Sequence, residues 1–165
     1  MAAGSTYTPI ATQTLASPAT VVNFTSISSS YTDLILVCQD ITSTGGTIEG
    51  IAVQVGNGSI DTGSNYSRTT LDGYTSATSG RSTNATSLDL GVIDNNTVGT
   101  SVYQFMNYAN TTTYKTILSR SGPSTYVRTA VGLWRSTSAI NAIKLSKTYN
   151  WAAGSTFTLY GIAAA

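Results

Sequence analysis

The residue in this chain that most resembles a catalytic group is Asp61, which begins the sequence Asp61-Thr62-Gly63. In aspartic proteases an aspartate in a D-T-G string pairs with a second aspartate, and the two carboxylates share a proton for general acid/base catalysis. This chain contains one such string, so a pair would need two copies of the chain. Residues 56–59 form a glycine-rich turn rather than the buried strand that positions a catalytic aspartate. We therefore interpret Asp61 as a turn residue that accepts hydrogen bonds from backbone N–H groups.

Other catalytic arrangements lack the residue types that they need. The chain has no His, the commonest general base and metal ligand and the usual partner of a catalytic Ser or Cys. No Ser lies three residues before a Lys, Glu49 is the single Glu, and no glycine-rich phosphate loop is present. Cys38 is the only Cys, and its apolar neighbours predict a small buried residue. The sequence predicts a protein that is not an enzyme and holds no cofactor or metal.

Aromatic and arginine side chains remain as candidates for binding. Trp134 and Trp151 could form stacking platforms for a glycan, although the apolar stretch around Trp134 favours a core position for that ring. Arginine is favoured at protein interfaces, and in a chain with few charges the five arginines are candidate contacts between subunits. They are Arg68, Arg81, Arg120, Arg128 and Arg135.

The composition limits the class of protein and its partners. Of the 165 residues, 41% are hydrophobic and only 9% are charged, while Ser and Thr fill about 30% of positions. A typical domain has about 25% charged residues. The net charge of +1, without runs of like charge, argues against a nucleic-acid partner and an anionic membrane. No segment has the pattern of a signal peptide or a membrane span, so we expect the protein to be made in a cytoplasm.

Short runs rich in Thr, Val, Ile and Tyr alternate with clusters of Gly, Asn, Asp and Ser, whereas helix signals are scarce. This pattern predicts an all-β chain with little or no helix. We expect residues 1–165 to form a single antiparallel β-sandwich of about ten strands, most resembling a jelly roll. The expected strands are 6–15, 19–24, 31–39, 48–55, 66–74, 87–93, 101–108, 113–119, 126–134, 139–146 and 155–163.

Details of these runs predict how several strands are placed. Ile51, Val53 and Val55 should share one buried face. Residues 34–38 are apolar at every position, as in a central strand covered on both sides. The near repeat of residues 4–8 at the other end of the chain suits two terminal strands that lie near one another. Residues 75–86 are polar and predict a long loop, either mobile or used for contact, with Arg81 near its tip.

Four strings of the chain resemble small β-rich virion proteins of tailed bacteriophages, especially phages of aquatic hosts including cyanobacteria. The similarity runs from about residue 7 to residue 162, and none of the strings is a catalytic signature. They are DTGSNYS at 61–67, NYANTTTYKT at 107–116, VGLWRST at 131–137 and GSTFTLYGI at 154–162.

This resemblance implies a virion structural protein with a jelly-roll fold. The leading hypothesis is a capsid decoration (cement) protein, commonly trimeric, whose partners are the major capsid protein and copies of itself. It would be made in the host bacterial cytoplasm and then stabilise the capsid surface through non-covalent contacts. The alternative is a tail-fibre or receptor-binding module that recognises a host surface glycan. A dimeric aspartic hydrolase built on Asp61 is a third hypothesis.

Overall fold

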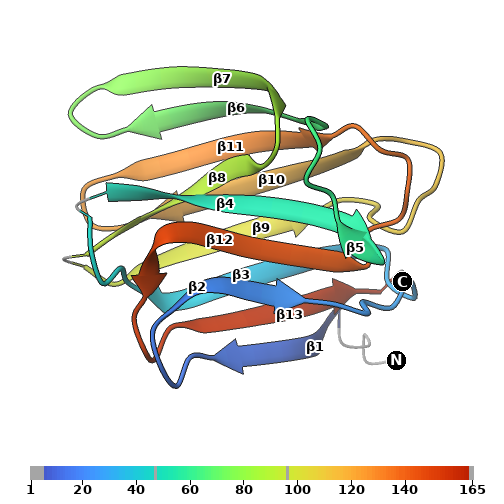
Figure 1. The fold of residues 1–165 in the computed structure, drawn as a ribbon, viewed down its shortest axis with the longest axis horizontal. Helices are drawn as coiled ribbons and strands as arrows, with labels where there is room; N and C mark the ends of the chain where they lie inside the picture. Colours follow the sequence, from blue (N-terminus) through green and yellow to red (C-terminus); the bar gives the residue numbers. More distant parts are fainter. Residues whose placement is uncertain (1–5, 47, 96, 164–165) are drawn as a thin grey trace.

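Alternation of apolar and hydroxyl side chains puts most of the chain into strands. The computed structural model describes residues 6–46, 48–95 and 97–163, and these contain thirteen strands in two antiparallel sheets (Figure 1). No helix among the described residues is long and apolar enough to cross a bilayer. The strands are β1 (Tyr7–Thr14), β2 (Ala19–Phe24), β3 (Asp33–Ile41), β4 (Ile48–Asn57), β5 (Ser59–Ile60), β6 (Tyr66–Gly73), β7 (Ala77–Ala85), β8 (Leu88–Asp94), β9 (Gly99–Phe105), β10 (Lys115–Gly122), β11 (Val127–Trp134), β12 (Ala142–Trp151) and β13 (Thr156–Ile162).

The strand order is that of a jelly roll with additional strands. The large sheet has the order β1-β13-β3-β9-β10-β11-β6-β7, and the small sheet has the order β2-β12-β4 followed by β5 and β8 on the same side of β4. The first strand pairs with the last, β2 pairs with β12, β3 with β9 and β4 with β8. This nested antiparallel pairing defines two Greek keys rolled into a sandwich. Strands β10, β11, β6 and β7 extend the large sheet beyond the eight-strand jelly roll.

One continuous core fills the space between the sheets. The inward-facing side chains of β3, β4 and β9 are fully buried, among them Leu36, Val53 and Tyr103. Strand β8 crosses the inner face of β10 and β11 so closely that a Cβ at Gly132 would lie 2.7 Å from Leu88. The sheets can approach to this distance because position 132 carries no side chain.

Two serines of the large sheet cover the backbone of β8 at its unpaired edge. The Ser119 hydroxyl donates to the carbonyl of Leu90 (2.7 Å), and the backbone N–H of Val92 donates to the Ser121 hydroxyl (3.0 Å). These bonds satisfy backbone groups that an edge strand would otherwise leave open. They also join the small sheet to the large one along β10.

The all-β sandwich is confirmed, and each of the eleven expected strands has a counterpart. Ile51, Val53 and Val55 are buried together, and the terminal strands pair through β1 and β13. Cys38 is a free, buried residue, and burial raises the pKa of its thiol. The structure adds the short β5 and the nine-residue β7.

Two expectations about local structure are wrong. The polar segment 75–86 contains strand β7, because its backbone pairs with β6 although neither of its faces is buried. Strand β3 is central in its sheet but is covered by a second layer on one side only. Its outward-facing residues, Ile35 and Val37, pair with Gln104 and Val102 of β9 on the outside of the sandwich.

Candidate binding face

Asp61 lies in the connection between β5 and β6, where it fixes a turn to the large sheet. One carboxylate oxygen accepts the backbone N–H of Gly63 (2.8 Å), and the other accepts the Trp134 indole N–H (2.7 Å) and the Asn65 amide (2.9 Å). Burial alone raises the pKa of Asp61, but these three hydrogen bonds outweigh it and hold the pKa below its ordinary value. The structure therefore supports the interpretation of Asp61 as a residue that ties down a turn.

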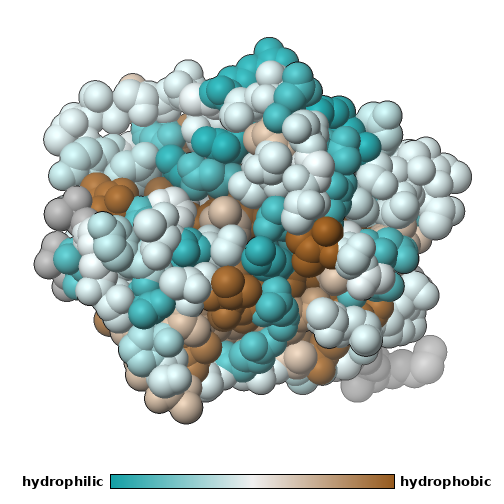
Figure 2. Space-filling model, in the orientation of Figure 1, coloured by the Kyte–Doolittle hydropathy of each residue, from teal (hydrophilic) through white to brown (hydrophobic). Residues whose placement is uncertain are grey.

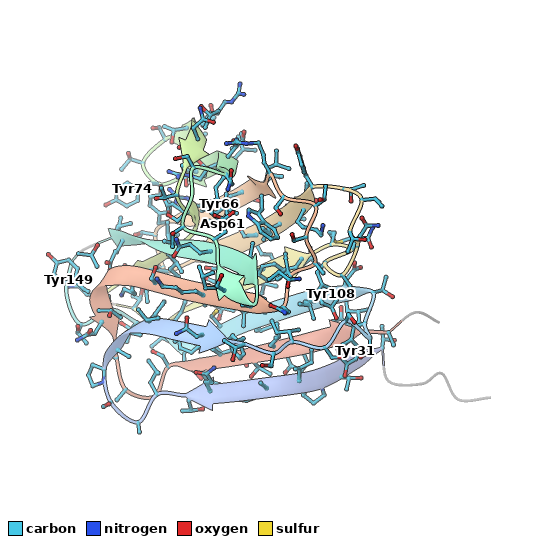
Figure 3. All side chains as sticks on the ribbon, turned by 45° about the vertical axis from the view of Figure 1, so that its right-hand side comes forward. Tyr31, Asp61, Tyr66, Tyr74, Tyr108 and Tyr149 are labelled. Carbon is cyan, nitrogen blue, oxygen red and sulfur yellow. The ribbon has the colours of Figure 1, made fainter. Side chains whose placement is uncertain are left out.

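Tyr66 also holds the Asp61 turn in place, through contacts of its hydroxyl with backbone groups of Val55 and Asp61. The buried Tyr66 hydroxyl lies within hydrogen-bond distance of the carbonyls of Val55 and Asp61 and accepts the backbone N–H of Val55. Burial raises the pKa of Tyr66 to about 12. Figure 3 shows Asp61 and Tyr66 beside one another, and Tyr31 and Tyr108 as a second pair elsewhere in the molecule. In that second pair, the Tyr108 hydroxyl donates to the carbonyl of Ser28 and accepts the backbone N–H of Tyr31.

An open hollow of about 390 Å³ lies beside the Asp61 turn. Its lining includes Asn57, Thr62 and Ser138, and Asp61 is its one carboxylate. An aspartic protease needs two carboxylates that share a proton, and this hollow supplies one that is already engaged in three hydrogen bonds. Among the described residues no three His, Cys, Asp or Glu side chains lie together in a metal-binding group.

Three of the five arginines form internal contacts. Arg128 pairs with Asp72 (2.6 Å) and Asp89 (2.9 Å), and Arg68 also reaches Asp89 (3.3 Å). These ion pairs join β11 and β6 of the large sheet to β8 of the small sheet. Arg135 donates hydrogen bonds to the Ser67 hydroxyl and to the Asn84 side chain. Arg68, Arg128 and Arg135 therefore stabilise the fold in this structure.

The two tryptophans are core residues. Trp134 is 3% exposed and Trp151 is fully buried, packed edge-on against Phe157. A glycan stacks on an aromatic ring only where one face of the ring is open, and neither indole has such a face here. The exposed aromatic side chains are tyrosines, among them Tyr74 and Tyr149 at the end of the molecule away from Tyr108 (Figure 3).

Two buried lysines were not singled out from the sequence. Lys115 is 1% exposed and donates to the backbone carbonyls of Thr113 (2.7 Å) and Thr137 (3.2 Å). Lys147 donates to the Ser43 hydroxyl (2.8 Å) and pairs with Glu49 (3.0 Å). Burial lowers the pKa of both lysines, and for Lys147 the Glu49 carboxylate partly offsets this effect.

The Lys147 Nζ lies 2.8 Å from the Ser43 Oγ, which is close enough for a serine–lysine catalytic dyad. The surroundings of these two groups are nevertheless unsuited to catalysis. The Lys147 side chain has no exposed surface, Ser43 is 5% exposed, and the Glu49 carboxylate favours the charged ammonium rather than the free base. Glu49 also accepts the backbone N–H groups of Thr148 and Tyr149. The cluster connects the end of β12 to the start of β4.

The outward-facing side of the large sheet, called the outer face from here on, is covered by no second layer of the described chain. On this face, residues that lie opposite one another on successive strands form two adjacent rows, which run from β13 to β7. Leu118, Val131 and Leu71 are 44%, 50% and 57% exposed within these rows. The rows are Thr158, Val37, Val102, Arg120, Thr129, Leu71 and Ser79, and Tyr160, Ile35, Gln104, Leu118, Val131, Thr69 and Arg81.

The charge of these two rows is limited to two arginines. Arg81 and Arg120 form no ion pair with the described residues, and neither row contains an Asp or a Glu. Three shallow hollows of about 120, 260 and 270 Å³ lie among the side chains of the outer face and of the strand ends beside it. The opposite side of the molecule, seen in Figure 2, is a mixture of hydrophilic residues and separate hydrophobic ones.

A scan of protein-family models finds no match, and no curated protein matches the sequence.

Proposed function

We propose that the protein is a structural component of a bacteriophage virion, and that it binds the capsid through the outer face. The observation that carries this proposal is the row of exposed apolar side chains on the outer face. Leu71, Leu118 and Val131 are 57%, 44% and 50% exposed there, and the described chain places no second layer over them. We assign the second layer to a partner protein.

The chemistry of the outer face defines that partner. Val37, Val102, Leu118 and Val131 offer apolar area at the centre, and Thr and Gln side chains surround it with hydrogen-bonding groups. The face carries positive charge through its arginines, so the partner surface should be apolar with carboxylates at its margins. A capsid subunit is the partner that the resemblance to phage virion proteins suggests.

In this role the protein decorates the assembled shell and stabilises it without covalent bonds. The jelly-roll sandwich suits that role because polar connections fix its turns and ion pairs join its sheets. The low charge of the chain permits dense packing of many copies, since repulsion between neighbours is small. Assembly as a homotrimer remains a prediction from the resemblance.

The number of copies in the virion distinguishes this proposal from its alternative, a receptor-binding module of the tail. Quantitative mass spectrometry of purified virions should find hundreds of copies per particle if the protein decorates the shell. A few copies, or a few dozen, would contradict the decoration role and favour the tail module, which should then bind a host glycan.

Binding of purified protein to capsids that lack it tests the outer face directly. Leu118→Asp and Val131→Asp place a charge at the centre of this face and should each weaken binding at least tenfold. Val21→Asp is the matched control, because Val21 is 39% exposed on the small sheet. Equal binding by all three variants would contradict the assignment of the face.

A further inference from the structure

Strand β7 ends the large sheet with an unprotected edge. It has nine residues, its backbone pairs with β6 on one side, and seven of its positions are exposed. Natural edge strands are commonly protected by proline, bulges, short length or covering side chains, because open backbone groups pair with other strands. The β6–β7 ladder has a register irregularity between Ser82 and Ala85, but residues 77–82 of β7 have none of these protections apart from the charge of Arg81.

The other sheet edges of the described chain are protected. Strand β1 contains Pro9 and a register irregularity directly after it. In β2 the carbonyl of Asn23 accepts a hydrogen bond from the Gln13 side chain (2.6 Å). The β8 edge is covered by serines of β10, and β5 has only two residues. This contrast singles out β7 as the edge available for pairing.

We propose that β7 pairs with β7 of a second copy of this chain, antiparallel and about a two-fold axis perpendicular to the sheet. Such an axis keeps the outward-facing residues of both copies on the same side of the joined sheet. Because side chains alternate between the two faces of a strand, an odd-numbered residue must then lie opposite an odd-numbered one, and an even-numbered residue opposite an even-numbered one. With the axis at Gly80, residues 77–83 of one copy pair with 83–77 of the other. About six to eight backbone hydrogen bonds form in a pairing of this length.

The positions of charge and of backbone irregularity favour this register. With the axis at Gly80, Arg81 of each copy lies opposite Ser79 of the other. Moving the axis to position 81 would place the two arginines directly opposite one another, which is destabilising. It would also pair Asn84, whose φ of 54° departs from strand geometry. Within β7 the hydroxyl, Gly and Ala side chains create no steric obstacle to a second copy.

The result is a continuous sixteen-stranded sheet, formed from the eight strands of each copy. Its two outer faces lie side by side and point in the same direction. This inference rests on the edge of the sheet and is independent of what the outer face binds, so it can fail or hold separately from the proposed virion role.

The test uses opposite charges at Ser79, which is exposed in the single chain. Ser79→Lys places a positive charge opposite Arg81 of the second copy at two symmetric positions and should weaken dimerisation about tenfold. Ser79→Asp should strengthen it by a similar factor. Thr116→Lys and Thr116→Asp are matched controls, because Thr116 is exposed on β10 of the same sheet, three strands from the edge.

Sedimentation over a concentration series gives the dimerisation constant of each full-length variant. Amide hydrogen exchange of residues 77–83 in the wild type should slow as the protein concentration rises. A chain that stays monomeric would overturn the inference, as would an oligomer indifferent to charge at Ser79. Exchange at β7 that does not change with concentration would overturn it as well.

Discussion

Replacement of Asp61 by Ala should destabilise the fold by about 2 kcal/mol, because the carboxylate holds the turn to the large sheet. Two of its three hydrogen-bond donors, on Gly63 and Asn65, are exposed and can bond to water when the carboxylate is gone. The third is the indole N–H of Trp134, a residue that is 3% exposed. Leaving a buried donor without a partner costs about 1–3 kcal/mol, and this term sets the magnitude.

For a chain of this length, about 2 kcal/mol corresponds to a fall in Tm of about 4–8 °C. Asp61→Asn should lose about half as much, since its amide oxygen can still accept the indole N–H but the charge is gone. Urea unfolding, followed by tryptophan fluorescence, measures the free energy of unfolding for each variant. Thr62→Ala is the matched control, because Thr62 is an exposed residue of the same turn.

The pH dependence gives this prediction a second measurement. The pKa of Asp61 is lower in the folded chain than its ordinary value of 3.8, so the folded state favours the ionised form. The resulting stabilisation is present above about pH 4 and is lost as the pH falls through the folded pKa. The advantage of wild type over Asp61→Asn should therefore shrink below pH 4. An Asp61→Ala chain as stable as the Thr62→Ala control would refute the reasoning.

Three further substitutions test the internal polar contacts. Arg128→Ala should cost about 3 kcal/mol in urea unfolding, because it leaves the Asp72 carboxylate without its cation and leaves Asp89 paired with Arg68 alone. Arg120→Ala, which breaks no ion pair among the described residues, should change stability by less than about 0.5 kcal/mol. Ser119→Ala should cost about 1 kcal/mol by removing the donor to the Leu90 carbonyl, and hydrogen exchange in β8 should quicken; unchanged exchange would contradict its role at that edge. Burial lowers the pKa of Lys115, so between the folded pKa and about 10.5 the unfolded chain binds more protons and this residue makes stability rise with pH. Urea midpoints from pH 8 to 10.5 should rise less for Lys115→Met than for wild type, and parallel curves would refute this.

The strands were largely predictable because most of them have one buried face, which leaves an alternating pattern in the sequence. Strand β7 has no buried face, so its pairing with β6 is set by the backbone, and its composition is typical of a loop. The apolar run in β3 correctly indicated a central strand but suggested a second covering layer that the described chain lacks. A sequence pattern records that a side chain avoids water without saying which chain covers it.

The polar contacts of the site were less predictable, because their partners are distant in the sequence. Arg128 is 56 residues from Asp72 and 39 from Asp89, and Ser43 is 104 residues from Lys147. No local motif identifies such pairs. The role of Asp61 could be predicted because part of its environment is local: the backbone N–H that it accepts is two residues away.

The two proposals together predict that β7 affects capsid binding although its pairing does not involve the capsid. A two-fold pair presents two outer faces on one surface, so binding of the first face holds the second close to its own site. The second binding event then occurs at a high effective concentration, and the combined affinity can exceed that of one face by about a hundredfold or more when the geometry permits both contacts.

Ser79→Lys should therefore weaken binding to capsids, and the loss should be small for a capsid fragment that offers a single site. Val21→Lys, on the small sheet away from the outer face, is the control for added charge in this assay. If Ser79→Lys lowers the affinity for single sites and whole capsids equally, Ser79 contacts the capsid directly and the pairing does not contribute to binding. A loss confined to whole capsids would mean that pairing at the sheet edge strengthens the contacts of the outer face.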